Sequence, residues 1–281
     1  MITLSSDFGW PYPAAMKGVI LQWTDARLVD ITHEFPRQDV RASAFWLREV
    51  LPYFPQAVHL VVVDPGVGTD RAALAVRAGE HALVGPDNGV LVPVARELAR
   101  GTGQSGSEAA SGDGFEVFRV VERSEAEGDQ PPAPGSDWPP TPASSTFHGR
   151  DVFAPAAARV HRLGVGKFHG DPGFQRVERF EGLRFPEPDV RTDGATGEVL
   201  VVDGFGNVIT NVPGGVATDR LGTTIEVNGD PAPVRGTYAR RGPGERLVTV
   251  GSHGNVELAV NRGRGDEVFG LEPGDAVHLS W

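Results

Sequence analysis

The chain has 281 residues, a length that favours two packed domains over one, because domains cluster near ~100–150 residues. Hydrophobic residues make up 40% of the sequence, which excludes general disorder. The formal net charge of −11 excludes an extended basic surface, so we do not expect nucleic acid as a partner. The sequence contains no cysteine, which excludes disulfides, thiolate metal ligands and thiol nucleophiles.

The N-terminal residues 1–7 lack the basic start and apolar core of a signal peptide. No apolar run approaches the ~20 residues that a membrane-spanning helix needs. The sequence therefore predicts a cytoplasmic protein that has no membrane partner.

Short β-rich runs alternate with helical patterns in the first part of the chain. Strands are expected over 2–4, 28–31 and 58–63, and helices over 14–23 and 40–51. Such alternation predicts βαβ units that build a parallel sheet. Ligands bind beyond the carboxyl ends of such strands, where the chain carries Ser6–Gly9 and Asp64–Arg71.

Residues 101–145 are rich in glycine, serine, proline and acidic residues, and we interpret them as a loop-rich insertion. One strand-like stretch covers 115–121. The segment 122–144 is predicted to be a mobile surface excursion, because its composition buries too little apolar area to offset chain entropy. A helix is expected to resume at Asp151.

The character of the sequence changes beyond residue 188, and short strands are expected at close spacing over 199–202, 208–210, 224–227, 247–250, 256–260 and 276–279. This pattern predicts a small antiparallel sandwich or barrel. The predicted fold is therefore an N-terminal α/β/α domain with a mainly parallel sheet over 1–190, followed by a smaller C-terminal antiparallel β domain over 196–281.

Polar residues and glycines replace apolar residues at four predicted strand or helix ends: Asp7–Gly9, Asp64–Arg71, Thr146–Asp151 and Asp203–Asn207. Each segment alone has an ordinary structural interpretation. An Asp before a Gly is a common turn former, and Asp64 and Arg71 could form a surface ion pair. A functional interpretation depends on the four segments occurring together.

Together and in this order, the motifs resemble the S-adenosylmethionine (SAM) hydrolases, also called SAM hydroxide adenosyltransferases, which are related to the SAM-dependent fluorinase and chlorinase. The likeness rests on Ser6–Gly9, Met16–Ile20, Asp30–Glu34, Asp64–Gly68, Gly85–Gly89, Phe147–Pro155 and Asp203–Asn211. It covers almost the whole chain apart from 101–145. The resemblance implies cleavage of SAM with water into adenosine and methionine, by a homotrimer whose active sites lie between neighbouring subunits.

Asp64, Arg71 and His148 match the family residues that position the attacking water or hydroxide. The chemistry suits these residue types, because a sulfonium leaves as a neutral group and only the nucleophile needs assistance. Arg71 would favour hydroxide by its charge, and His148 would add a hydrogen bond. Asp64 would either accept the proton or orient the water.

The resemblance also implies a set of substrate-binding residues. Asp7 matches a carboxylate that binds both ribose hydroxyls, with Phe8 beside it, and Asp203 matches a partner of the methionine ammonium. Phe205 and Asn207 stand where the family contacts adenine. Ser252 matches a contact to the methionine carboxylate, although His253 follows it where the fluorinase carries an arginine.

Two alternatives remain open from the sequence. A chlorinase-like halogenase would use the same displacement, but Gly149 and Asp64 stand where the fluorinase has a halide-binding serine and a tyrosine. A non-catalytic adenosine or SAM sensor is the other alternative. A sensor has no need of Asp64, Arg71 and His148 behind C5′ of the ribose.

We expect no metal and no cofactor, with SAM as the substrate. Asp30, His33 and Glu34 suggest metal ligands at first, but no second histidine stands at ligand spacing and the family uses no metal. Asp87 and Asn88 are interpreted as turn residues that shape the site.

Overall fold

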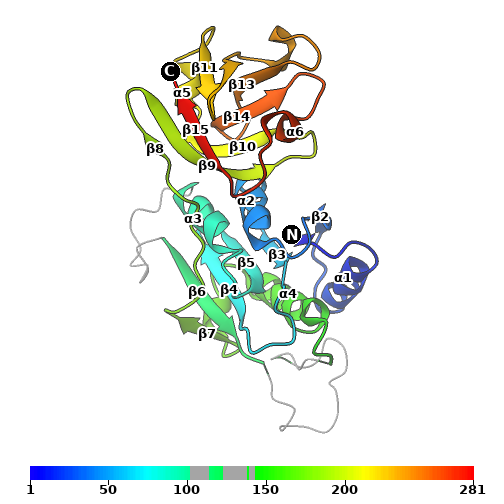
Figure 1. The fold of residues 1–281 in the computed structure, drawn as a ribbon. Helices are drawn as coiled ribbons and strands as arrows, with labels where there is room; N and C mark the ends of the chain where they lie inside the picture. The colour runs from blue at the N-terminus through cyan, green and yellow to red at the C-terminus, as the bar shows by residue number, and fades with distance from the viewer. Residues whose placement is uncertain (102–113, 123–137, 139–142) are drawn as a thin grey trace. The chain divides into compact units, whose positions relative to one another are not determined.

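The computed structural model describes residues 1–101, 114–122, 138 and 143–281 (Figure 1). They form two compact units, Met1–Leu183 and Arg184–Trp281, each with its own hydrophobic core. Among these residues, no helix is long and apolar enough to cross a membrane.

The first unit is built on a seven-stranded sheet with the order β2-β1-β3-β5-β4-β6-β7. Its strands are β1 (Ile2–Ser6), β2 (Leu28–Thr32), β3 (Val58–Val62), β4 (Ala73–Ala78), β5 (His81–Pro86), β6 (Phe115–Val120) and β7 (Phe174–Val177). The predicted parallel sheet is confirmed for β2, β1, β3 and β5. The sheet continues in antiparallel pairing through β4, β6 and β7, because a tight hairpin at Gly79 joins β4 to β5.

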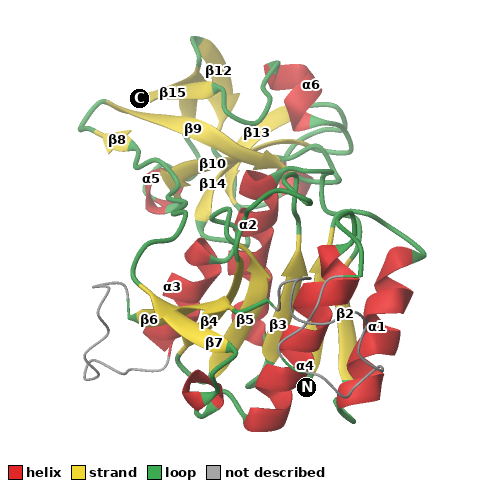
Figure 2. Cartoon of the chain, turned by 90° about the horizontal axis from the view of Figure 1, so that it is seen from below, coloured by secondary structure: helices red, strands yellow, loops and turns green. Residues whose placement is uncertain are grey.

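Four helices cover the sheet, namely α1 (Tyr12–Trp23), α2 (Val40–Val50), α3 (Val92–Gly101) and α4 (Ala154–Leu163). Helices α1 and α4 pack together on one face, and α2 and α3 pack together on the other (Figure 2). Asp39 caps α2, since its side chain accepts a hydrogen bond of 2.8 Å from the Ala42 N–H. Short helical turns occur at η1 (Leu51–Tyr53) and η4 (Phe168–Gly170).

The helix expected from Asp151 begins earlier. A π-helical turn, η3 (Gly149–Phe153), leads directly into α4. Such π-helical turns are rare in proteins overall, and those that occur are often found at functional sites. Here the turn directly follows His148, one of the predicted site residues.

Most of the predicted surface excursion over 122–144 lies outside the described residues. Trp138 within it is described, and it packs against the core of the first unit. Its indole N–H donates a hydrogen bond of 2.7 Å to Asp171, and its ring contacts Phe174. This position of the excursion is therefore anchored to the core.

The second unit is an eight-stranded antiparallel sheet with the order β12-β11-β15-β9-β10-β14-β13, and β8 pairs with β9. Its elements are β8 (Asp189–Val190), β9 (Gly194–Val202), β10 (Val208–Pro213), α5 (Gly215–Thr218), β11 (Thr224–Val227), β12 (Asp230–Pro233), η5 (Tyr238–Arg240), β13 (Arg246–Val250), β14 (Asn255–Val260), α6 (Gly265–Phe269) and β15 (Ala276–Ser280). A bridge between Val234 and Val248 brings the two ends of the sheet together. The result is nearly a barrel, as the close spacing of strands predicted.

Candidate active site

Three neighbouring parallel strands deliver polar residues to one edge of the first sheet. Strands β1, β3 and β5 are adjacent and parallel, so their carboxyl ends meet at the same edge. Asp7 directly follows β1, Asp64 lies two residues beyond β3, and Asp87 directly follows β5. Because β1 and β3 are buried along their whole length, carboxylates can be accommodated only where these strands leave the core.

Asp64 and Arg71 form an ion pair within the loop 64–71, which we call the nucleophile loop. Arg71 Nη1 donates to Asp64 Oδ1, and the Gly66 N–H donates to the same oxygen at 3.1 Å. Both of these contacts use Oδ1 of the carboxylate. The Asp64 side chain is only 7% exposed, so its charge is weakly screened.

Gly66 is required for this pairing. A Cβ atom at Gly66 would occupy the position of the Arg71 guanidinium group. The absence of a side chain therefore lets Arg71 fold back over the loop and reach Asp64.

Four of the predicted site residues line one small pocket of about 80 Å³. These are Asp7, Phe8, Asp64 and His148, and the walls are completed by Val62, Val67, Thr146, Phe147, Gly149 and Phe153. Arg71 is linked to this pocket through Asp64. It also lines an open hollow beside Asp87 and Asn88.

The walls of the pocket are tightly packed near His148. A Cβ atom at Gly149 would lie 3.0–3.2 Å from Met16, Phe147 and Val62, so a larger residue there requires its neighbours to move. The rings of Phe8, Tyr12 and Phe147 contact one another edge to face, with centroids 5.4–6.1 Å apart. The pocket therefore combines two carboxylates and a histidine with an aromatic wall.

Asp7 is held by an unusual backbone contact. Its Oδ2 accepts a hydrogen bond of 2.6 Å from the Gln38 N–H. Gln38 has a φ of 62°, in the left-handed region that non-glycine residues seldom adopt. No local sequence pattern pointed to Gln38.

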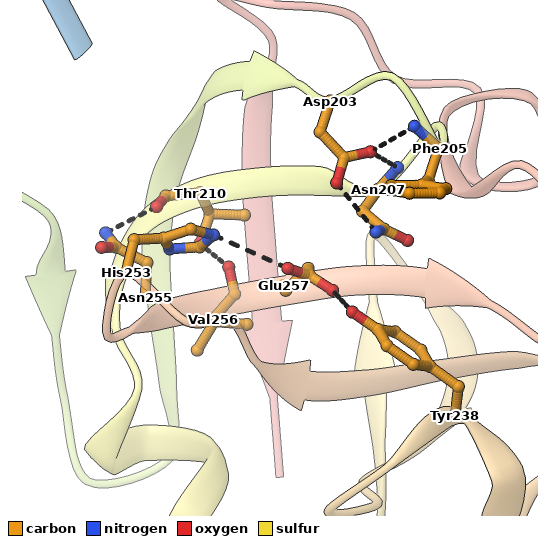
Figure 3. A network of polar contacts seen from close by, with 9 residues as sticks. All are labelled: Asp203, Phe205, Asn207, Thr210, Tyr238, His253, Asn255, Val256 and Glu257. Carbon is orange, nitrogen blue, oxygen red and sulfur yellow. Dashed lines mark hydrogen bonds and ion pairs between the residues drawn. The ribbon is translucent and has the colours of Figure 1, made fainter. Parts of the chain in front are cut away.

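Three of the predicted residues of the second unit, Asp203, Phe205 and Asn207, lie on the loop between β9 and β10 (Figure 3). Asp203 Oδ1 accepts hydrogen bonds of 2.9 and 2.8 Å from the Phe205 and Asn207 N–H groups, and Oδ2 accepts one of 2.9 Å from Asn207 Nδ2. Asp203 thus shapes the loop 203–207. Asn207 is buried, whereas Phe205 is 80% exposed.

Ser252 is exposed in the turn between β13 and β14, and the next residue, His253, points inward. His253 Nε2 lies 3.6 Å from Glu257 Oε2, and the Tyr238 hydroxyl donates to Glu257 Oε1 at 2.5 Å (Figure 3). Burial and the Glu257 carboxylate raise the pKa of Tyr238 well above its ordinary value. Sequence reasoning did not identify Tyr238 or Glu257, because each belongs to no local motif.

Two of the three residues considered as metal ligands, Asp30 and His33, belong to a hydrogen-bonded chain. His33 Nε2 lies 3.0 Å from Asp30 Oδ1, His33 Nδ1 lies 2.7 Å from Ser6 Oγ, and Lys17 donates to Asp30 at 2.5 Å. In the part of the chain that the structure describes, no cluster of three or more His, Asp or Glu residues is placed to hold a metal ion.

Carboxylates and a histidine at the carboxyl edge of a parallel sheet, in a chain that continues into a β domain, define a two-domain protein that binds a small molecule. Residues 2–167 match the SAM hydroxide adenosyltransferase N-terminal domain, and residues 197–278 match the C-terminal domain. The chain belongs to the SAM hydroxide adenosyltransferase family.

Similar proteins extend over nearly the whole chain. A protein from Salinispora tropica named (R)-S-adenosyl-L-methionine hydrolase is 40% identical, covering 99% of this chain and 97% of the relative. One of the same name from Thermus thermophilus is 39% identical, with 98% and 97% coverage. A crystal structure of an uncharacterized conserved protein from Thermotoga maritima has a TM-score of 0.76 and 30% identity, and it covers 100% of both chains.

Proposed function

We propose that this protein hydrolyses S-adenosyl-L-methionine to adenosine and L-methionine, by attack of water on C5′ of the ribose. The observation that carries the proposal is the Asp64–Arg71 ion pair, whose Asp64 carboxylate lines one small pocket together with Asp7 and His148. Membership of the family and the 40% identity to a hydrolase named for this substrate support the same reaction.

The reaction is an in-line displacement. The water oxygen forms a bond to C5′ while the C5′–S bond breaks, and the electron pair of that bond goes to sulfur, which leaves as the neutral thioether of methionine. No acid is needed for such a leaving group. Asp64 orients the water through Oδ2 or takes its proton, Arg71 favours the hydroxide form, and His148 provides a further hydrogen bond.

The size of the pocket supports its assignment to the nucleophile. A volume of about 80 Å³ accommodates a few water molecules, since each occupies ~30 Å³ in the liquid. Alignment of a water molecule behind C5′ supplies a large part of the rate acceleration, since effective molarities for well-aligned partners reach ~10⁵ M or more. The enzyme needs no metal or cofactor in this scheme.

The remaining predicted residues bind the substrate in this proposal. Asp7 Oδ1 accepts from the ribose hydroxyls, while Gln38 holds Oδ2. The exposed ring of Phe205 stacks on adenine, with Asn207 beneath the same loop. Asp203 pairs with the methionine ammonium, and the exposed Ser252 contacts the methionine carboxylate.

A homotrimer with active sites between subunits is part of the proposal. The pocket is far smaller than the ~300 Å³ or more of a typical ligand site, so additional walls are required to enclose SAM. Tyr12, whose ring contacts Phe8 and Phe147 of the pocket wall, is 54% exposed, and Trp10, two residues earlier in the chain, is 86% exposed. Both side chains are suited to form such an interface. Sedimentation of the active protein should show a trimer, and an active monomer would refute this part.

The stereochemistry at sulfur adds a finer prediction. The names of the relatives specify the (R) epimer of the sulfonium. We extend this preference to the present chain, and we place the enzyme in the cytoplasm, where SAM is made and used.

Incubation of the pure protein with each sulfonium epimer tests the function. Adenosine and methionine should form in equal amounts, faster from the (R) epimer, and a chelator should not reduce the rate. Methylthioadenosine or S-adenosylhomocysteine as the main product would contradict the proposal. Equal rates from both epimers would contradict the stereochemical part alone.

The two alternative functions receive less support. A halide-binding serine at position 149 would crowd Met16 and Val62, and the Asp64 carboxylate opposes an anion ~4 Å away by about 4 kcal/mol at an effective dielectric of ~20. Reactions in molar potassium chloride should therefore give adenosine and almost no 5′-chloro-5′-deoxyadenosine. A non-catalytic sensor leaves the Asp64–Arg71 pair without a purpose.

A further inference from the structure

The nucleophile loop is fixed at both ends by the loop that follows β5. Asn88 Nδ2 donates a hydrogen bond of 2.9 Å to the carbonyl oxygen of Val63, the residue before Asp64. The Asp87 N–H donates one of 2.9 Å to the carbonyl oxygen of Ala72, the residue after Arg71. Two consecutive residues of one loop thus hold the two flanks of the other.

Asn88 and Asp87 are themselves held in place. Asn88 Oδ1 accepts from the Val90 N–H at 3.2 Å, and Asp87 Oδ1 accepts from the Glu181 N–H at 2.7 Å. Gly85 brings β5 close to β3, because a Cβ atom there would lie 2.5 Å from the carbonyl oxygen of Val61. We call these contacts of Asp87 and Asn88 with the flanks of the nucleophile loop the clamp. The clamp depends on the close approach of β3 and β5 and on the orientation of the two side chains.

The clamp also places a second carboxylate near Arg71. Asp87 and Arg71 line the same open hollow. Burial raises the pKa of Asp87 overall, although the hydrogen bond from the Glu181 N–H and, to a smaller extent, the Arg71 charge act to lower it. Asp87 therefore lies beside Arg71 and also holds the Ala72 end of the nucleophile loop.

We propose that Asn88 is a positioning residue, which fixes the Asp64–Arg71 pair through the carbonyl of Val63. The inference rests on the proposed function, because the pair is the group that directs water. Asn88 touches no reacting atom in this scheme. Its effect arises because alignment of the nucleophile is sensitive to displacements of ~1 Å, which can cost ~10²-fold in rate.

The variant Asn88→Asp separates this role from turn formation. It keeps the oxygen that accepts from Val90 and loses the amide group that donates to Val63. We expect kcat for adenosine formation to fall roughly 10- to 100-fold, with little change in KM. Asn88→Ser, whose hydroxyl can also support the turn, serves if Asn88→Asp fails to fold.

Asn261→Asp is the matched control. Asn261 Nδ2 donates a hydrogen bond of 2.7 Å to the carbonyl oxygen of Arg241, so the same chemical change breaks the same kind of bond in the second unit. Its kcat should stay near that of the wild type. Equal losses in both variants, an unchanged kcat in Asn88→Asp, or a change confined to KM would overturn the inference.

Hydrogen exchange measured by mass spectrometry provides a readout without substrate. Amides of residues 64–72 should exchange faster in Asn88→Asp than in the wild type and Asn261→Asp, whereas those of β1 should not change. Unchanged exchange in 64–72 would overturn the clamp, whatever the activity. If the wild type forms no adenosine, the proposed function fails, and this measurement still decides the clamp.

Discussion

At the scale of single residues, the proposed chemistry depends on Asp64, Arg71 and His148. Substitution of each residue by alanine should lower kcat by a factor of roughly 10² or more, as is typical when a general base or an electrostatic group is removed. Substrate affinity should change less, because these residues lie behind C5′ in the proposed site. Steady-state kinetics of the three variants measures both effects, and wild-type turnover in Asp64→Ala would remove that residue from the mechanism.

Gly66 offers a test of the ion pair without altering either partner. In Gly66→Ala, the new methyl group would displace the guanidinium of Arg71 from Asp64. We expect a loss of kcat that approaches that of Arg71→Ala, in a protein that still folds. Gly18→Ala is a suitable control, since nothing lies within 4 Å of the added Cβ atom. Equal activity of Gly66→Ala and the control would contradict the proposed role of the pair.

Some residues of the candidate site could be identified from the sequence, and others could not. Asp7, Asp64 and His148 stand in motifs at element ends, and the structure brings them to one pocket. Gln38 and Glu257 carry no such signal, because their roles arise from contacts with residues 31 and 19 positions away. Long-range contacts of this kind are not visible in local patterns.

At the scale of elements, β3 contains a buried histidine whose protonation opposes folding. His59 is fully buried beside Thr3 and His81, with contacts of 2.8 and 3.0 Å. Burial, with a smaller contribution from His81, lowers the pKa of His59 from 6.5 to about 3. The unfolded chain therefore binds a proton more readily than the folded protein.

The sign of the pH effect follows from this difference. The contribution of neutral His59 to the free energy of unfolding is fully present above about pH 6.5. It is lost as the pH falls towards about 3, at a rate of up to ~1.4 kcal/mol per pH unit. Urea denaturation at several pH values should show this decline, and His59→Gln should reduce it. The exposed His278→Gln is the control. An equal decline in His59→Gln and the wild type would contradict the argument.

The sequence predicted regular elements better than irregular ones. The expected runs over 2–4, 28–31 and 58–63 became β1, β2 and β3. Strands β1 and β3 are buried along their whole length, as continuous apolar runs predict, whereas β2 at the sheet edge is only partly buried. The β4–β5 hairpin was not singled out, and η3 was missed because a π-helical turn continues the helical pattern. Trp138 was placed in a surface excursion because one anchoring residue does not alter a polar composition.

At the scale of the whole molecule, the predicted combination of an α/β domain and a β domain is confirmed, and each unit carries part of the predicted site. The first unit presents the pocket lined by Asp7, Asp64 and His148, and the second presents the loop 203–207 and the turn that carries Ser252. Composition and strand spacing were sufficient to predict the two architectures. Assembly could not be derived from them, because an interface has no periodic pattern in the sequence.

The central claim is that water attacks C5′ of SAM. The most direct test is to run the reaction in H₂¹⁸O and analyse both products by mass spectrometry. The account predicts that adenosine carries one ¹⁸O in its 5′-hydroxyl group and that methionine carries none. Unlabelled adenosine, or label in a fragment of the amino-acid chain together with methylthioadenosine, would show that the nucleophile or the carbon attacked is different.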